Sequence, residues 1–149
     1  LSKLLAKNVK MREYPLMIKM RRFKIDKLIR DRFPEILSNS GIKVFERNLS
    51  QDEYIDSLKD KLVEEAQEIC DADNKDDILE ELADLFEVMT TFAKVQGFEL
   101  QDIMRIAEEK KLNKGGFVFK TYVDFVEIES THPNIKYYQA SPAKYPEII

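Results

Sequence analysis

Two neighbouring segments, residues 51–72 and 76–96, each have the spacing of apolar side chains that is typical of an amphipathic helix. At about 100° per residue, these side chains fall on a single stripe of each helix. Ser50 and Glu53 form the Ser-x-x-Glu pattern of a capping box, which predicts that the first helix begins there. The connection, residues 71–75, is short enough to predict an antiparallel helical hairpin.

Each predicted helix carries an acidic side chain at the margin of its apolar stripe, and a second one three residues later. In the first helix these residues are Glu65 and Glu68, and in the second they are Glu81 and Asp84. A hairpin that turns at residues 74–75 places Glu65 opposite Asp84. It also places Glu68 opposite Glu81. Four carboxylates are therefore expected to meet at the border of the core.

A bound cation would relieve the repulsion that this convergence creates. Like charges one turn apart repel each other on a helix, and partial burial of a charge adds to the cost. A solvated acidic face is the alternative, and it accounts for Glu64, Glu80 and Glu87. It does not account for Glu81, which helical spacing places among apolar side chains. An all-oxygen site of this kind suits Mg²⁺ or Mn²⁺ better than Zn²⁺.

The turn sequence DADNKDD resembles the start of an EF-hand loop, but the pattern fails at three positions. Counted from Asp71, Lys75 occupies the fifth position and Asp76 stands where the loop requires glycine. Leu82 stands at the twelfth position, where the loop requires glutamate. The chain also lacks a P-loop sequence, which argues against kinase or motor chemistry.

The rest of the sequence predicts a mainly α-helical protein with a little β structure. A proline in the first turn and a glycine at the end predict a short helix over residues 31–41. Another helix is predicted over residues 100–113, closed by two glycines. The apolar run at residues 117–128 predicts one strand. Residues 1–23 form a basic arm, and residues 129–149, with three prolines, are expected to form an irregular tail.

Four motifs occur in order along residues 24–128. DKLIRDRFPEI begins at Asp26, the paired acidic motif described above follows, EELADLFEV begins at Glu80, and KKLNKGGF begins at Lys110. Together they resemble the MazG-like all-alpha nucleoside triphosphate pyrophosphatase superfamily. The opening motif, EELADLFEV and the closing motif resemble a house-cleaning branch that is related to phosphoribosyl-ATP pyrophosphohydrolase.

This resemblance implies a fold and a reaction. The fold would be an all-alpha helical bundle of residues 24–128, completed by oligomerisation as a homodimer or a larger assembly, with a short C-terminal β segment. The reaction would be hydrolysis of a nucleoside triphosphate, standard or non-standard, to the monophosphate and pyrophosphate. The implied cofactor is Mg²⁺, with Mn²⁺ as a substitute. The resemblance assigns the metal-binding and catalytic roles to Glu65, Glu68, Glu81 and Asp84.

Basic residues within the matching motifs are the implied contacts of the substrate phosphates. These are Lys27, Arg30 and Lys114. Arginine suits bidentate contact with phosphate, whereas lysine acts as a point charge. The alternative for each residue is a solvated surface cation. Which carboxylate orients the attacking water stays open, and Glu64 is a further candidate.

Two other functions remain open. One is a phosphoribosyl-ATP pyrophosphohydrolase of histidine biosynthesis, and the other is a catalytically silent helical assembly or regulatory module on the same scaffold. Residues 1–30 carry a charge of +8 within a chain of net charge −4, but no nucleic-acid motif accompanies it, so nucleic acid is not an expected partner. The single Cys70, and the lack of a membrane-length apolar run, lead us to expect a cytoplasmic protein.

Overall fold

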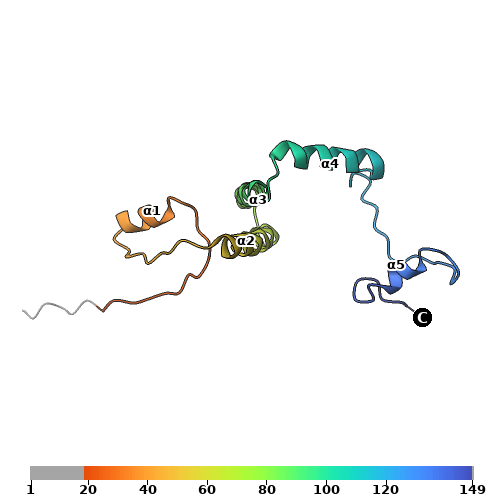
Figure 1. Cartoon of the computed structure of the whole chain (residues 1–149), viewed down its shortest axis with the longest axis horizontal. Coiled ribbons are helices and arrows are strands. Elements are labelled where there is room, and N and C mark those ends of the chain that lie inside the picture. The colour runs from red at the N-terminus through yellow and green to blue at the C-terminus, as the bar shows by residue number, and fades with distance from the viewer. Residues whose placement is uncertain (1–18, 149) are drawn as a thin grey trace, which may run out of the picture. The chain divides into compact units, whose positions relative to one another are not determined.

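The computed structural model describes residues 19–148 of the chain, and within them it contains five helices and no strand. The helices are α1 (Phe33–Asn39), α2 (Gln51–Asp71), α3 (Lys75–Val95), α4 (Leu100–Lys114) and α5 (Ile135–Gln139) (Figure 1). The chain divides into two compact units between Gly97 and Phe98. None of the described helices is long and apolar enough to cross a membrane. The prediction of a mainly α-helical protein is confirmed.

The helices α2 and α3 pack side by side as the predicted hairpin (Figure 1). At the start of α2, Ser50 Oγ accepts a hydrogen bond from the Glu53 N–H, and Glu53 Oε2 accepts one from the Ser50 N–H. At the start of α3, Asn74 Oδ1 accepts hydrogen bonds from the N–H groups of Asp76 and Asp77. These caps satisfy N–H groups that have no partner within the helix, and so fix where each helix begins.

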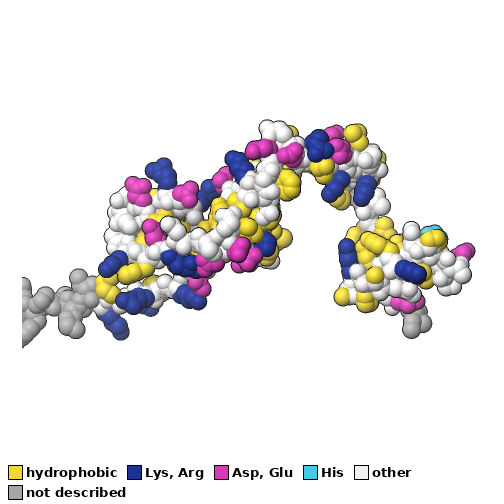
Figure 2. Space-filling model, in the orientation of Figure 1, with side chains coloured by type: hydrophobic (Ala, Val, Ile, Leu, Met, Phe, Trp, Pro, Cys, Tyr) yellow, Lys and Arg dark blue, Asp and Glu magenta, His cyan; other side chains and the backbone are white. Residues whose placement is uncertain are grey.

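The core between these helices is small. Among the described residues, Leu58 of α2 and Ala93 of α3 are the only buried apolar side chains. Leu79, Leu82 and Phe86 of α3 are instead exposed, although their spacing of three and four residues places them on one helical face. Figure 2 shows hydrophobic side chains in yellow at the surface of this helix pair. Residues 19–97 of the first unit therefore leave this apolar face uncovered.

The predicted strand over residues 117–128 is wrong, since this segment has no regular secondary structure. Lys120 adopts a left-handed conformation with φ of 55°, and its N–H donates to the Phe117 carbonyl, so the chain turns there. Phe117 and Phe119 are almost fully exposed. A strand needs backbone hydrogen bonds from a neighbour, and no described segment supplies them. An apolar run in one segment cannot provide that partner.

The tail beyond residue 129 was predicted to be irregular, but it contains regular structure. It contains α5, and the Tyr137 ring lies 5.3 Å from the Tyr138 ring and 5.5 Å from the Tyr145 ring, between centroids. The hydroxyl oxygens of Tyr137 and Tyr145 are 3.1 Å apart. A helix of five residues is too short for its apolar periodicity to be recognised in the sequence. The first eighteen residues of the predicted basic arm lie outside the described residues.

Candidate metal and phosphate site

Three carboxylates meet between the two long helices. Glu65, Glu68 and Glu81 each contribute one oxygen to a group in which all oxygens lie within 4.8 Å of one another. Glu65 and Glu68 are three residues apart on α2, and Glu81 reaches them from the neighbouring α3. The structure thus brings together three of the four acidic residues that the hairpin predicts as neighbours.

The two innermost carboxylates each have an unpaired oxygen. Glu65 is only 3% exposed. Its Oε1 accepts a hydrogen bond from Lys61 Nζ, but its Oε2 is buried without a hydrogen-bond partner among residues 19–148. Oε2 of Glu81 is buried and unpaired in the same way. A buried acceptor without a partner is costly, so two of them beside a third carboxylate fit a site built for a hard cation.

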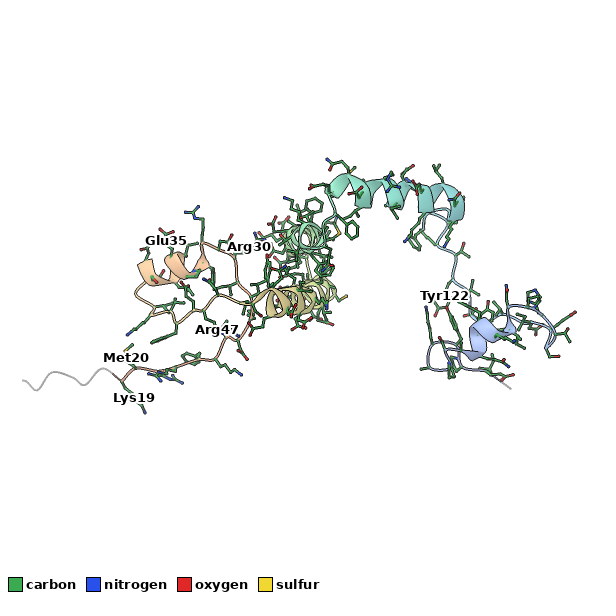
Figure 3. The ribbon with its side chains drawn as sticks, viewed as in Figure 1. Lys19, Met20, Arg30, Glu35, Arg47 and Tyr122 are labelled. Atoms are coloured by element: carbon green, nitrogen blue, oxygen red, sulfur yellow. The ribbon has the colours of Figure 1, made fainter. Side chains whose placement is uncertain are left out.

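The fourth predicted ligand, Asp84, lies on α3 three residues after Glu81 but has a different partner. Arg30 Nη2 donates a hydrogen bond to Asp84 Oδ1 over 2.5 Å. Figure 3 shows Arg30 on the segment that leads into α1, next to the α2–α3 pair. The predicted phosphate-binding arginine and a predicted metal ligand therefore form an ion pair with each other.

A second predicted phosphate contact, Lys27, pairs with Glu64. Lys27 Nζ lies 2.6 Å from Glu64 Oε1, and Lys61 Nζ lies 3.4 Å from Glu64 Oε2. The hydrogen bond from Lys27 lowers the pKa of Glu64, although partial burial opposes the change. Partial burial alone would lower the pKa of Lys61, but its contacts with Glu65 and Glu64 outweigh this and raise it.

The sequence interpretation missed two features of this region. It placed Glu64 on the outward face of its helix, whereas two lysines cover its carboxylate in the structure. It also assigned nothing to Lys61. The signal for Lys61 was present, because an i,i+4 lysine and glutamate are neighbours on a helical surface.

The third predicted phosphate contact, Lys114, lies in the other unit, at the end of α4. It lines a cavity there together with Ala107, Lys110, Lys111, Gly115, Gly116 and Phe117. Gly115 has a φ of 81°, a left-handed conformation that glycine adopts without strain, and this ends the helix. The cavity is basic, which suits an anion. The role of Lys114 stays a prediction.

Comparison with known proteins identifies the family. A profile of the phosphoribosyl-ATP pyrophosphohydrolase family matches residues 25–111, which is more than half of the chain. The chain belongs to this family. The family is part of the MazG-like all-alpha nucleoside triphosphate pyrophosphatase superfamily, so the resemblance seen in the motifs is confirmed. The matched range contains all of the predicted site residues except Lys114.

A curated relative is much less informative. The chain is 47% identical over 53 residues to an uncharacterized protein of Mycolicibacterium smegmatis. The alignment covers 36% of this chain and 54% of the relative, so the chain spans about half the length of the protein that it matches. No solved structure matches the chain significantly. The family assignment therefore rests on the profile and the four motifs.

Family and geometry agree on one class of chemistry. The family consists of pyrophosphohydrolases and is typically metal-dependent. In this chain, three glutamates supply carboxylate oxygens, and two of these glutamates, Glu65 and Glu81, have a buried oxygen without a partner. Lys27 and Arg30 bring positive charge to carboxylates on the same two helices. This combination is suited to holding divalent cations and an anionic substrate together.

Proposed function

We propose that the chain is a Mg²⁺-dependent nucleoside triphosphate pyrophosphohydrolase. It cleaves the bond between the α and β phosphates and releases a nucleoside monophosphate and pyrophosphate. The observation that carries the proposal is Oε2 of Glu65, a buried and unpaired carboxylate oxygen within a cluster of three glutamates. Membership of a pyrophosphohydrolase family supports the same reaction.

The proposed metal ligands are Glu65, Glu68, Glu81 and Asp84. Two helices with capped ends hold the first three in place, so little reorganisation is needed for them to coordinate a cation. Bound Mg²⁺ would act as a Lewis acid on the phosphate oxygens and lower the pKa of a coordinated water. Mn²⁺ fits the same oxygen donors.

The basic residues make an acidic site acceptable to an anionic substrate. A triphosphate carries several negative charges, which the carboxylates alone would repel. Lys27 and Arg30 hold cationic groups 2.6 Å and 2.5 Å from Glu64 and Asp84. Because both cationic side chains are at least half exposed, they are free to contact phosphate oxygens as well. We propose Lys114 as a third contact.

Phosphoribosyl-ATP is the second candidate substrate, and the name of the matched family favours it. It would be cleaved at the same class of phosphoanhydride bond by the same carboxylates. A catalytically silent assembly is the remaining alternative. The presence of all four acidic residues argues against it, because the buried, unpaired oxygens of Glu65 and Glu81 reduce stability and a silent module would gain nothing from keeping them.

The test compares turnover by the wild type with that of two glutamine variants. The purified chain is incubated with Mg²⁺ and canonical nucleoside triphosphates, modified nucleoside triphosphates or phosphoribosyl-ATP, and pyrophosphate is separated from orthophosphate. Glu81→Gln removes a proposed ligand. Glu80→Gln is the matched control, because Glu80 is the exposed neighbour on the same helix.

The proposal expects monophosphate and pyrophosphate from the wild type and from Glu80→Gln. It expects at least a 100-fold lower kcat/KM for Glu81→Gln, about 2.7 kcal/mol of transition-state stabilisation. If the wild type hydrolyses phosphoribosyl-ATP but none of the nucleoside triphosphates, the second candidate is favoured. Equal turnover by both variants, or none by the wild type on any substrate, would remove the enzymatic interpretation of the cluster.

A further inference from the structure

We infer that Lys61 is a positioning residue for the proposed metal site. It holds one oxygen of Glu65 so that the other oxygen is presented to the cation. The inference rests on the proposed function, since it assumes that Glu65 is a metal ligand. It adds a residue outside the four carboxylates and the three phosphate contacts.

Lys61 lies one helical turn before Glu65 on α2, and its side chain is only 20% exposed. Its Nζ contacts Oε1 of Glu65 and lies 3.4 Å from Oε2 of Glu64. Lys59, on the same helix, differs in both respects. It is 57% exposed and pairs with the exposed Asp56. Lys61 is therefore an internal partner of the carboxylates, whereas Lys59 is an ordinary surface cation.

The contact with Lys61 distinguishes the two oxygens of Glu65. Oε1 has a charged hydrogen-bond donor, and Oε2 has no partner among the described residues although it is buried. A carboxylate that is fixed through one oxygen has a defined orientation for the other. Groups outside the ligand shell act in this way in metalloproteins, and their loss typically lowers metal affinity about 10- to 100-fold.

Charge alone would give the opposite effect. Lys61 carries a positive charge close to Glu65, and a positive charge near a cation site disfavours binding of the cation. If Lys61 acted only as a competing charge, its removal would strengthen metal binding. If it positions Glu65, its removal weakens binding, because Oε1 loses its partner and the carboxylate is free to reorient. The direction of the change therefore decides between the two roles.

Mn²⁺ binding to the full chain is measured by electron paramagnetic resonance, and Mg²⁺ binding by calorimetry, in both cases without nucleotide. The variants are Lys61→Met, which removes the charge and keeps much of the apolar stem, and Lys61→Arg, which keeps a charged donor. Lys61→Ser removes the charge and is too short to reach Oε1 of Glu65. Lys59→Met is the matched control. Circular dichroism and urea unfolding verify that each variant is folded.

Lys61→Met is expected to bind Mn²⁺ about 10- to 100-fold more weakly than the wild type. Lys61→Arg is expected to recover most of this loss, and Lys59→Met to match the wild type. Unchanged or tighter binding by Lys61→Met would overturn the inference. Should Lys61→Met not fold, Lys61→Ser decides in the same way, because it also removes the donor to Oε1: weaker binding than Lys61→Arg supports positioning, and equal or tighter binding refutes it.

The outcome for the wild type separates this inference from the proposed function. If the wild type binds no Mn²⁺, the metal site and the proposed function both fail. If the wild type binds Mn²⁺ and hydrolyses nucleotide while Lys61→Met binds equally well, only the role of Lys61 fails.

Discussion

Arg30 and Asp84, which are 54 positions apart in the sequence, are joined by a 2.5 Å hydrogen bond from Nη2 to Oδ1. The bond connects the segment before α1 to α3. The side chains are 63% and 43% exposed, and ion pairs as exposed as this one contribute only about 0–1 kcal/mol to stability. The pair is therefore expected to contribute little to the stability of the fold. Its geometric consequence is that a guanidinium lies beside Asp84, one of the proposed metal ligands.

We expect Arg30→Met to weaken nucleotide binding. The variant keeps an apolar side chain but loses the donors that suit bidentate contact with phosphate. The expected result is an approximately tenfold rise in KM, about 1.4 kcal/mol, with a smaller change in kcat. Steady-state kinetics with saturating Mg²⁺ measure both values.

Arg47→Met is the control for this prediction. Arg47 also belongs to a surface ion pair, with Glu53, and its side chain is 67% exposed. Figure 3 labels both arginines, on the segments before α1 and before α2. Arg47→Met is expected to keep the wild-type KM. An equal rise in KM for the two variants would mean that general surface charge, and not Arg30 itself, attracts the substrate.

Local spacing was sufficient to predict the hairpin and most of its acidic site. The capping box at Ser50 fixed the start of α2, and the helical period then placed Glu65 and Glu81 at the margin of the core. Helical spacing could not predict that Arg30 pairs with Asp84 or that Lys27 pairs with Glu64. Both basic residues lie on a segment without a recognisable period.

The wrong strand prediction has a related cause. Residues 117–128 are rich in aromatic and β-branched side chains, which satisfies the composition of a strand, but a strand depends on pairing with a second segment. No second segment of the sequence was identified as a pairing partner, and the strand prediction did not require one. The short helix α5 was not predicted because five residues give too few positions to establish a period.

A further prediction concerns the stability of the metal site. Binding of Mg²⁺ to the folded chain alone is expected to raise the free energy of unfolding, by about 2.7 kcal/mol at a concentration 100 times the Kd. In EDTA, Glu81→Gln is expected to be more stable than the wild type by about 1 kcal/mol. The substitution removes the charge of a carboxylate whose Oε2 is buried and unpaired. Urea unfolding with Mg²⁺ and with EDTA measures both effects.

The same variant should lose the response to Mg²⁺, whereas Glu80→Gln should keep it, because Glu80 is exposed. If Glu81→Gln were less stable than the wild type in EDTA and still stabilised by Mg²⁺, Glu81 would be a structural residue and not a metal ligand.

The cap of α2 gives a prediction about pH. The pKa of Glu53 is lowered from 4.5 to about 2, chiefly because the Arg47 guanidinium donates to its carboxylate, and also because the Ser50 N–H and hydroxyl interact with it. The folded-state pKa lies below the unfolded one, so the stability that Glu53 contributes is fully present above pH 4.5. It is lost as the pH falls from 4.5 to about 2.

Arg47→Met is expected to raise the pKa of Glu53 toward 4.5, because the largest cause of the lowering is removed. Carbon-detected nuclear magnetic resonance of the Glu53 carboxyl in the wild type and in Arg47→Met measures the change directly. The same pKa in the two proteins would show that the backbone N–H of Ser50 is the dominant partner.

The last prediction concerns the uncovered apolar face. Among the described residues only Leu58 and Ala93 form a buried apolar core, which is too little for a stable domain, while Leu79 and Phe86 of α3 are 67% and 50% exposed. We therefore expect a homodimer in which this face is covered by a second copy. Light scattering after size-exclusion chromatography should give about twice the 17.5 kDa of one chain.

Phe86→Glu places a charge in that expected interface, where it would lose its hydration, and it also removes about 1.5–3 kcal/mol of apolar burial per chain. The variant should shift to the monomer mass at micromolar concentration and unfold more readily. Phe45→Glu is the matched control, because Phe45 is 74% exposed on the segment before α2, outside this face. It should keep the dimer. A wild type that is already monomeric and folded at micromolar concentration would contradict the prediction, and it would mean that the two buried side chains and the helix caps suffice to hold α2 and α3 together.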